Sequence, residues 1–320
     1  MQKHENQLQI KEDFREFIGQ SFGYFALKVT NDRLTPIKLA KENLYDGFNL
    51  SKGDGNIDFG ISQNVREIGI NKDGSIYIDL IAQAKLEQLE RELASKSGEE
   101  RTKFVARKIT HIITNTKKFP SYNEIQDYAK RALIGIQTEA HTLAHFATKI
   151  AEKIQDLLDK HAKEQFLKKC ENDSIVITDD TNSFKIPNKD PQAITTSSKS
   201  LFSACRLNKF EKEAIEKIAS YNNVVCFYRN TEKKDFCFNG FLNFYPDFIV
   251  WTKKNVIFIE TKGDHLSEKD AMDKNLIAQK WIEKANKISD KNFKFFLVFE
   301  NKNLEQTYNL DEFLTQLESL

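Results

Sequence analysis

In the stretch "YPDFIVWTKKNVIFIETKG", Asp247 precedes one apolar run, and Glu260 and Lys262 end the next. Two carboxylates can hold a hard divalent cation, and an ammonium can stabilise the charge on a phosphate. Each of the three stands at the end of a run of Val, Ile and Phe, which is the composition of a buried strand. Burying a charge without a partner in a strand of this kind costs free energy, so the three charged side chains are expected to contact one another or a ligand.

Side chains alternate between the two faces of a strand, which divides the run ending at Lys262 into two sets. One face carries Val256, Phe258, Glu260 and Lys262, and the other carries Ile257, Ile259 and Thr261. Both faces are apolar, which predicts a central strand covered on both sides. Glu260 and Lys262 are therefore expected side by side at the C-terminal end of a buried strand.

The stretch from Asp247 to Glu260 also has the pattern of a β-hairpin that turns at Lys253 and Lys254. Its two ends are equally distant from the turn, so Asp247 pairs with Glu260 in the expected register. Both carboxylates and the Lys262 ammonium then meet at one rim of the sheet. The alternative is an ordinary surface hairpin with charged ends, because short motifs of this kind often occur by chance.

Carboxylates that meet at one rim suggest a metal site. Asp247 and Glu260, with the backbone carbonyl of Thr261, could hold Mg²⁺ and leave positions for water and a phosphate. A metal there polarises a phosphodiester and activates water for attack on phosphorus. Lys262 could orient that water or stabilise the charge that develops on the phosphate. The combination predicts hydrolysis of a nucleic-acid backbone.

The elements around these residues follow the order helix, three strands, helix, strand. They are an amphipathic helix over 207–220, strands at "VVCFYRN", "FCFNGFLNFYPDFIVWT" and "NVIFIETKG", a helix over 267–288, the strand "FKFFLVFE" and a short terminal helix. This order predicts a small α/β domain whose central sheet is covered on both faces.

The first half of the chain is mostly helix-forming. A helix is expected near 7–18, and the strands "VREIGI" and "SIYIDLIA" form a hairpin through an Asp-Gly turn. Most of 82–169 is helical, with a capping box formed by Ser121 and Glu124. The half is therefore expected to be a mainly helical α+β region.

Composition changes between the two halves. The stretch 172–200 contains two closely spaced prolines and a Ser/Thr cluster, which predicts a linker or an irregular extension. The expected organisation is a mainly helical region over 1–171, which could serve coupling or interaction, then this linker, then an α/β domain over 201–320.

Composition also bounds the class of protein. The chain has 320 residues, of which 40% are hydrophobic, enough for one large or two ordinary domains. No apolar run approaches the ~20 residues that cross a bilayer, and the start does not resemble a signal peptide, so no membrane partner and a cytoplasmic location are expected. Basic residues number 48 and acidic residues 47, so bulk charge does not indicate a nucleic-acid binder.

The segment from about Leu207 to Glu300 resembles the PD-(D/E)xK nuclease superfamily. Within it, the segment is similar to the C-terminal endonuclease domain of type III restriction enzyme Res subunits and related helicase-nuclease fusions. The motifs that carry the resemblance are "NKFEKEAIEKI", "FYRN", "YPDFIV", "ETKG" and "KNLIAQKWIEKAN", in that order. The resemblance implies a restriction-endonuclease-like α-β-β-β-α-β core and an Mg²⁺-dependent DNA endonuclease in which Mn²⁺ could substitute.

The resemblance also assigns roles to residues. It makes Asp247 and Glu260 metal ligands and Lys262 the catalytic lysine. A supporting glutamate of the first helix matches Glu211 best, with Glu213 as the alternative. The remaining candidates for nucleic-acid contact are Arg229 and Asn230, which could equally form a surface turn, and Lys274, Gln279 and Lys280, for which a solvated helix face is the alternative.

The resemblance implies partners as well. They are DNA, an ATPase or helicase motor and a modification methyltransferase. The chain has no G-x-x-x-x-G-K-[ST] motif, so no ATP site is expected in it. Two other hypotheses stay open: a nuclease fold without turnover that serves as a DNA-docking or assembly module, and a fragment whose activity depends on missing partner chains. Acidic and basic residues are equally numerous from Leu201 onward, so we expect weak, salt-sensitive DNA binding in isolation.

Overall fold

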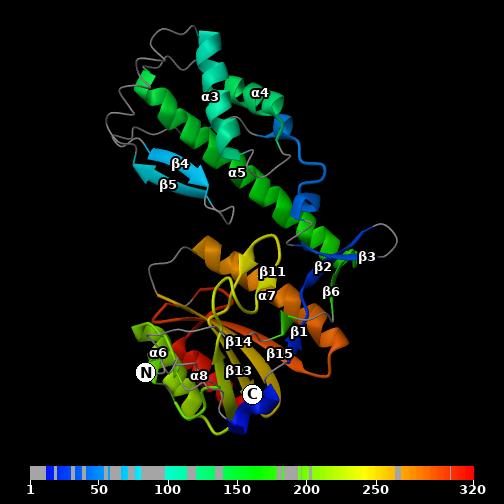
Figure 1. Cartoon of the computed structure of the whole chain (residues 1–320), viewed down its shortest axis with the longest axis vertical. Coiled ribbons are helices and arrows are strands. Elements are labelled where there is room, and N and C mark those ends of the chain that lie inside the picture. The colour runs from blue at the N-terminus through cyan, green and yellow to red at the C-terminus, as the bar shows by residue number, and fades with distance from the viewer. Residues whose placement is uncertain are drawn as a thin grey trace, which may run out of the picture. The chain divides into compact units, whose positions relative to one another are not determined.

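The structure of the chain is a computed structural model, drawn as a ribbon in Figure 1. It is a mixed α/β fold, as the sequence predicts. The residues that it describes are 12–17, 20–29, 33–37, 41–53, 57, 66–70, 76–80, 98–113, 120–133, 140–178, 182–183, 194–195, 197–201, 204–263, 268–302 and 304–320.

The chain divides into two compact units, one of which is discontinuous in sequence. Unit 1 comprises Met1–Ala40 and Lys168–Leu320, and unit 2 comprises Lys41–Leu167. The expected boundary at residue 171 differs from this division, because the described residues among the first 40 belong with the C-terminal part of the chain. The second boundary lies inside one helix, α5 (Ala140–Glu171).

The expected linker over 172–200 contains short strands. Its short apolar run forms β6 (Ile175–Ile177), which pairs antiparallel with β2 (Phe25–Val29). On its other edge, β2 pairs with β3 (Arg33–Pro36), which completes a three-stranded sheet. The apolar run is therefore a strand that ties the beginning of the chain to unit 1.

The larger sheet of unit 1 has the strand order β10, β13, β14, β15, β16. β10, β13 and β14 are antiparallel neighbours, whereas β15 runs parallel to β14 and β16 parallel to β15. The strand bounds are Val224–Arg229, Phe248–Thr252, Asn255–Lys262, Asn292–Phe299 and Tyr308–Asn309, in the same order. β13 and β14 form the predicted hairpin, with Phe248 opposite Ile259. The predicted register is confirmed.

Helices cover both faces of this sheet, as expected. The face with Ile257 and Ile259 packs against α6 (Lys209–Ser220) and α8 (Leu310–Ser319). On the other face, the Phe258 ring contacts Trp281 of α7 (Glu268–Ile288), with 5.5 Å between ring centroids. The predicted alternation along β14 is therefore confirmed, and it directs Glu260 to the face that α7 covers.

The N-terminal segment completes the face that α7 covers. Phe22 is buried, and its ring centroid lies 5.5 Å from that of Phe258 and 5.8 Å from that of Phe293. The indole Nε1 of Trp281 donates a hydrogen bond of 2.9 Å to the carbonyl of Gly23. A Cβ on Gly23 would lie 1.8 Å from the carbonyl oxygen of Thr178, so only glycine fits there.

Unit 2 has a helical core. Its helices are α3 (Gly98–Ile113), α4 (Tyr122–Ala132) and the greater part of α5. The predicted capping box begins α4, where the Ser121 N–H donates to Glu124 over 2.9 Å. The predicted hairpin is also present, formed by β4 (Arg66–Ile70) and β5 (Ile76–Leu80). Its turn lies outside the described residues.

The remaining elements are short. They are the 3-10 helices η1 (Glu12–Phe17), η3 (Lys41–Leu44) and η4 (Leu50–Lys52), and the strands β1 (Ser21–Phe22), β7 (Asn182–Ser183), β8 (Ile194–Thr195), β9 (Ala204–Cys205), β11 (Phe238–Asn239) and β12 (Asn243–Phe244).

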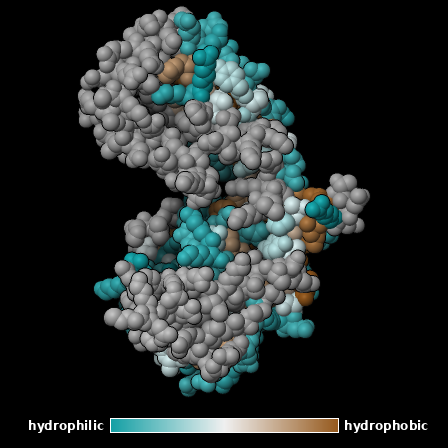
Figure 2. All heavy atoms as spheres, viewed as in Figure 1, coloured by the Kyte–Doolittle hydropathy of each residue, from teal (hydrophilic) through white to brown (hydrophobic). Residues whose placement is uncertain are grey.

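The described surface that faces the viewer in Figure 2 is mainly hydrophilic, with small hydrophobic areas. Large apolar side chains that are exposed on the described residues are Leu34, Met272 and Ile288. Single exposed apolar residues are normal on globular proteins. Among the described helices, none combines the length and the apolar character that crossing a bilayer requires.

Candidate active site

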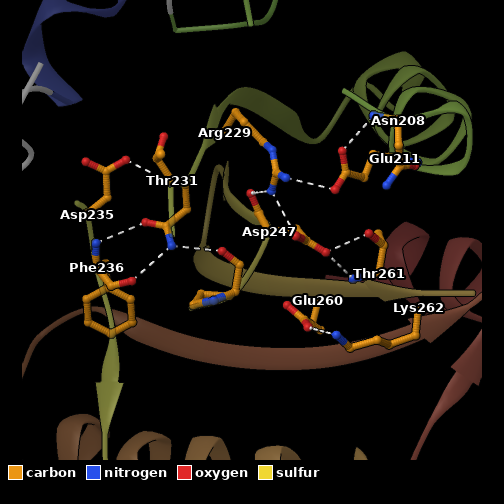
Figure 3. Close-up of polar contacts among 12 residues, drawn as sticks. Asn208, Glu211, Arg229, Thr231, Asp235, Phe236, Asp247, Glu260, Thr261 and Lys262 are labelled. Atoms are coloured by element: carbon orange, nitrogen blue, oxygen red, sulfur yellow. Dashed lines mark hydrogen bonds and ion pairs between the residues drawn. The ribbon is translucent and has the colours of Figure 1, made fainter. Parts of the chain in front are cut away.

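Asp247, Glu260 and Lys262 meet at one rim of the larger sheet (Figure 3). The ladder between β13 and β14 ends at the pair Phe248 and Ile259, so the next residue on each strand is one of the two carboxylates. β10 ends nearby at Arg229, which is paired with Phe248. The hairpin register therefore places the three predicted residues together.

Asp247 is held by hydrogen bonds on both carboxylate oxygens. Its Oδ2 accepts from the backbone N–H of Thr261 over 2.8 Å and from the Thr261 hydroxyl over 2.6 Å. Its Oδ1 accepts from Nη1 of Arg229 over 2.9 Å. A carboxylate oxygen can accept two hydrogen bonds, so Oδ1 keeps an open lone pair. Thr261, predicted to contribute its carbonyl to a metal, thus also orients Asp247.

Glu211 reaches the same rim from the first turn of α6. Asn208 begins this helix, and its backbone N–H donates to Glu211 Oε2 over 2.8 Å while its side chain caps the Glu211 N–H. The other oxygen, Oε1, accepts from Arg229 Nη2 over 2.8 Å. Burial raises the pKa of Glu211 above its usual value, more than the Arg229 guanidinium lowers it.

Glu211 is therefore the glutamate of α6 that the structure brings to the site. The alternative, Glu213, is exposed and forms an ion pair with Lys217 over 3.0 Å. Arg229 lies between Glu211 and Asp247 with both of its terminal nitrogens engaged. These contacts make Arg229 a residue that positions two carboxylates, whereas its contact with a phosphate stays a prediction.

Glu260 is buried, with a side chain that is 4% exposed. One of its oxygens, Oε1, contacts the ammonium groups of Lys262 and Lys274, the second over 3.4 Å. The other oxygen, Oε2, is buried and has no hydrogen-bond partner among the residues that the structure describes. A buried carboxylate oxygen without a partner is unfavourable, which makes Oε2 a candidate for contact with a ligand.

Lys274, for which a solvated helix face or a nucleic-acid contact was expected, lies instead against Glu260. It comes from α7, and its side chain is 17% exposed rather than solvated. Besides Glu260 it contacts Asp270 over 3.1 Å. Burial lowers the pKa of Lys274, but the carboxylates of Glu260 and Asp270 outweigh burial and raise that pKa. Asp270 and Lys274 are four residues apart, so the sequence could have predicted that they pair along one face of a helix. That spacing does not show which face of the helix meets the sheet.

Asn230 has a structural role in place of the expected nucleic-acid contact. It is 2% exposed, and its Nδ2 donates to the carbonyls of Phe236 and Pro246 over 2.9 and 2.8 Å. Its Oδ1 accepts from the Phe236 N–H over 3.0 Å. Both N–H groups and the oxygen are used within the fold, so the side chain holds the backbone before Asp247 in place.

Lys280 and Gln279, also considered for nucleic-acid contact, are not brought to the site. Lys280 forms an ion pair with Glu283 over 3.2 Å, and Gln279 donates to Asn275 over 3.4 Å. Lys280 follows Lys274 by six residues, which is about 9 Å along a helix axis. Neither contact involves Asp247 or Glu260, so a role at the rim does not follow for these two residues.

The pKa of Glu260 predicts how stability depends on pH. Burial, reinforced by the negative charge of Asp247, raises this pKa from 4.5 to about 7, although Lys262 and Lys274 lower it. Between these two values the folded state binds one more proton than the unfolded state. The free energy of unfolding should therefore fall as pH rises from about 4.5 to about 7, by up to about 3 kcal/mol.

This pH dependence can be measured by urea denaturation followed by tryptophan fluorescence. The chain has two tryptophans, Trp251 and Trp281, and both belong to unit 1. The matched variant is Glu260→Gln, which does not titrate and should show a flatter dependence over the same range. Equal slopes in the two proteins would contradict the assignment to Glu260.

The residues at the rim fit a hard divalent cation. The donor atoms are oxygens, and Oε2 of Glu260 and Oδ1 of Asp247 each have capacity for a further ligand. Searched over the described residues, the structure has no group of three or more His, Cys, Asp or Glu placed to hold a metal. A cation there would therefore take its other ligands from water, from the phosphate and from a backbone carbonyl such as that of Thr261.

Comparison with known proteins adds no relative. No family model matches the chain, and neither the curated proteins nor the solved structures give a match. The residues at the rim and the fold that holds them are therefore the basis for a functional proposal.

Proposed function

We propose that unit 1 is a metal-dependent endonuclease of the PD-(D/E)xK class that hydrolyses DNA phosphodiester bonds. The observation that carries the proposal is Glu260, a buried carboxylate with one oxygen that lacks a partner among the described residues. It stands next to Asp247 and Lys262, the two other groups that the chemistry needs. A fold rarely keeps such an oxygen without a ligand for it.

The order and direction of the elements support this class. The larger sheet and its helices follow the order α6, β10, β13, β14, α7, β15, with the short strands β11 and β12 between β10 and β13. This order is compatible with the α-β-β-β-α-β core that the resemblance implies. Three antiparallel strands followed by a parallel fourth place the ends of β13 and β14 at one rim. The candidate residues stand at that rim.

Each residue has a distinct task in the proposed reaction. Asp247 and Glu260 hold Mg²⁺ or Mn²⁺, with the carbonyl of Thr261 as a third protein ligand, and the cation supplies Lewis-acid polarisation of the phosphate and activation of water. Lys262 stabilises the charge that develops on the phosphate or orients the attacking water. Arg229 and Glu211 keep Asp247 in place through their ion pairs.

The partners follow from the class. The substrate is DNA, and the proposed setting is a type III restriction-like or helicase-nuclease system in the cytoplasm. An ATPase or helicase motor and a modification methyltransferase would supply what the sequence lacks, namely an ATP site and sequence selection. Unit 2 is then a candidate for coupling unit 1 to these partners.

A second candidate is a catalytically silent module that docks DNA or partner proteins. The observation in its favour is that each carboxylate of the site is already in contact with a basic side chain: Glu211 and Asp247 with Arg229, and Glu260 with Lys262 and Lys274. Such a network can serve structure alone. A cleavage assay separates the two candidates.

The test is cleavage of supercoiled and linear plasmid DNA by the purified chain with Mg²⁺ or Mn²⁺, beside an EDTA control. Lys262→Ala is expected to lower the cleavage rate by about a hundredfold or more, because it removes a charge that stabilises the transition state. The matched control is Lys253→Ala, which changes an exposed lysine in the hairpin turn and should leave the rate unchanged.

Cleavage that needs metal and Lys262 would establish the nuclease. If the wild type is inactive alone, the assay is repeated with candidate ATPase and methyltransferase partners. Inactivity with partners would contradict the proposed function and favour the docking module. Cleavage that survives Lys262→Ala would contradict the assignment of the reaction to this site.

A further inference from the structure

Six charged side chains gather at the rim, and their charges cancel when all six are ionised. Three are carboxylates and three are cations: Glu211, Asp247 and Glu260 against Arg229, Lys262 and Lys274. A seventh, Asp270, pairs with Lys274 and has a side chain that is 44% exposed. A divalent cation that binds there adds two positive charges to a balanced set. The side chain that balances Glu260 in the absence of metal therefore matters for how tightly a metal binds.

Lys274 is held at this position from several sides. Its Nζ lies 3.4 Å from Glu260 Oε1, 3.1 Å from Asp270 Oδ2 and 5.4 Å from the centre of the Phe244 ring. The residue belongs to α7, whereas Lys262 belongs to β14, so the two ammonium groups reach Glu260 from different elements. Contacts with Glu260, Asp270 and Phe244 therefore fix the position of the Lys274 ammonium at the site.

We propose that Lys274 is a resident counter-charge that stabilises Glu260 while no divalent cation is bound and weakens the binding of that cation. The proposal rests on the proposed function, because it concerns the same metal site. Lys274 acts through Glu260 and is therefore a positioning residue.

The two effects of Lys274 have opposite signs. Removing its charge leaves the buried Glu260 with Lys262 alone, which destabilises the metal-free protein. The same change makes the site more negative, and a divalent cation interacts strongly with a charge a few ångströms away in a partly buried place. A residue that only supports the fold would produce the first effect without the second.

The test uses the full chain and Mn²⁺ alone as the probe. Lys274→Met is expected to tighten the Kd for Mn²⁺, measured by titration calorimetry at fixed pH, by about tenfold. In the metal-free protein the same substitution should lower the unfolding temperature by about 4 °C or more. Added Mn²⁺ should therefore raise the unfolding temperature further in the variant than in the wild type.

Three further variants make the result specific. Lys274→Gln removes the charge, keeps a hydrogen-bond donor and serves if the methionine variant does not fold; it should also tighten Mn²⁺ binding. Lys274→Arg keeps the charge and should bind Mn²⁺ as the wild type does. Lys280→Met removes a lysine of the same helix that pairs with Glu283 and should change neither quantity.

The outcomes separate the two proposals. Mn²⁺ binding by the wild type with unchanged or weaker binding by Lys274→Met and Lys274→Gln would overturn the role of Lys274 and leave the nuclease intact. Absence of Mn²⁺ binding in the wild type, together with absence of cleavage, would overturn the proposed function and this inference with it. Tighter binding in both uncharged variants supports the counter-charge.

Discussion

A fragment of residues 201–320 is expected to lose cooperative unfolding, although the sequence predicts it as a complete domain. Its α7 face is covered in the full chain by the N-terminal segment, with Phe22 against Phe258 and Phe293. Removing a buried aromatic side chain costs about 3–5 kcal/mol, which is a large part of the total stability of a domain. The fragment also exposes those rings to water.

Two further contacts would be lost in the fragment. Asn239 forms a pair of hydrogen bonds with the backbone of Phe25, of 2.9 Å to the N–H and 2.8 Å to the carbonyl. Trp281 loses its acceptor, the carbonyl of Gly23. A buried donor without a partner costs about 1–3 kcal/mol.

The measurement is urea denaturation followed by tryptophan fluorescence, since the fragment retains Trp251 and Trp281. In the full chain, Phe22→Ala should lower the free energy of unfolding of unit 1 by about 3–5 kcal/mol. The control Leu34→Ala, at an apolar residue of the same segment that is 42% exposed, should change it by less than about 0.5 kcal/mol. A fragment as stable as the full chain would refute the role of the N-terminal segment.

Arg229→Met is expected to cost unit 1 about 3–5 kcal/mol, because it leaves two partly buried carboxylates facing each other without a cation. The guanidinium donates to Asp247 over 2.9 Å and to Glu211 over 2.8 Å, and it also donates to the backbone carbonyl of Asp247 over 2.7 Å. The planar guanidinium of Arg229 therefore binds both carboxylates at once. Arg229→Lys keeps the positive charge but lacks the two separate nitrogens that reach both carboxylates, so an intermediate loss of stability is expected.

Urea denaturation at neutral pH checks this prediction. Adding Glu211→Gln to Arg229→Met removes one of the two unpaired charges and should recover part of the lost stability, which a double-mutant cycle measures. Arg206→Met, at an exposed arginine, should have little effect. A loss for Arg229→Met no larger than for Arg206→Met would show that the ion pairs contribute nothing to the fold.

The hairpin at the rim was predictable because its information is local. The distance of Asp247 and Glu260 from the turn sets the register, and alternation along β14 sets the two faces. Glu211 was expected from the resemblance alone, and the structure shows a local signal that was not used, the capping box formed by Asn208 and Glu211. These features depend on residues that are close in sequence, so a single sequence is enough to predict them.

Lys274 and the N-terminal segment were not predictable in this way. The polar face of α7 contains several lysines, and only the rotation of the helix on the sheet decides that Lys274 meets Glu260 while Lys280 does not. Asn239 and Phe25 are 214 positions apart, and no periodicity connects them. Asn230 was expected at a nucleic-acid contact or in a surface turn because of the resemblance, whereas its side chain has three partners in the backbone around it.

The insertion of unit 2 within unit 1 also sets the order in which the protein can assemble during translation. Phe25 leaves the ribosome 214 residues before Asn239, its partner. At about 5–20 residues per second, the first strands wait roughly 10 to 40 s for the sheet that will cover them. Unit 2 is complete well within that interval, so it has time to fold first. The nascent chain therefore carries the exposed side chains of Phe22 and Phe25 through most of its synthesis.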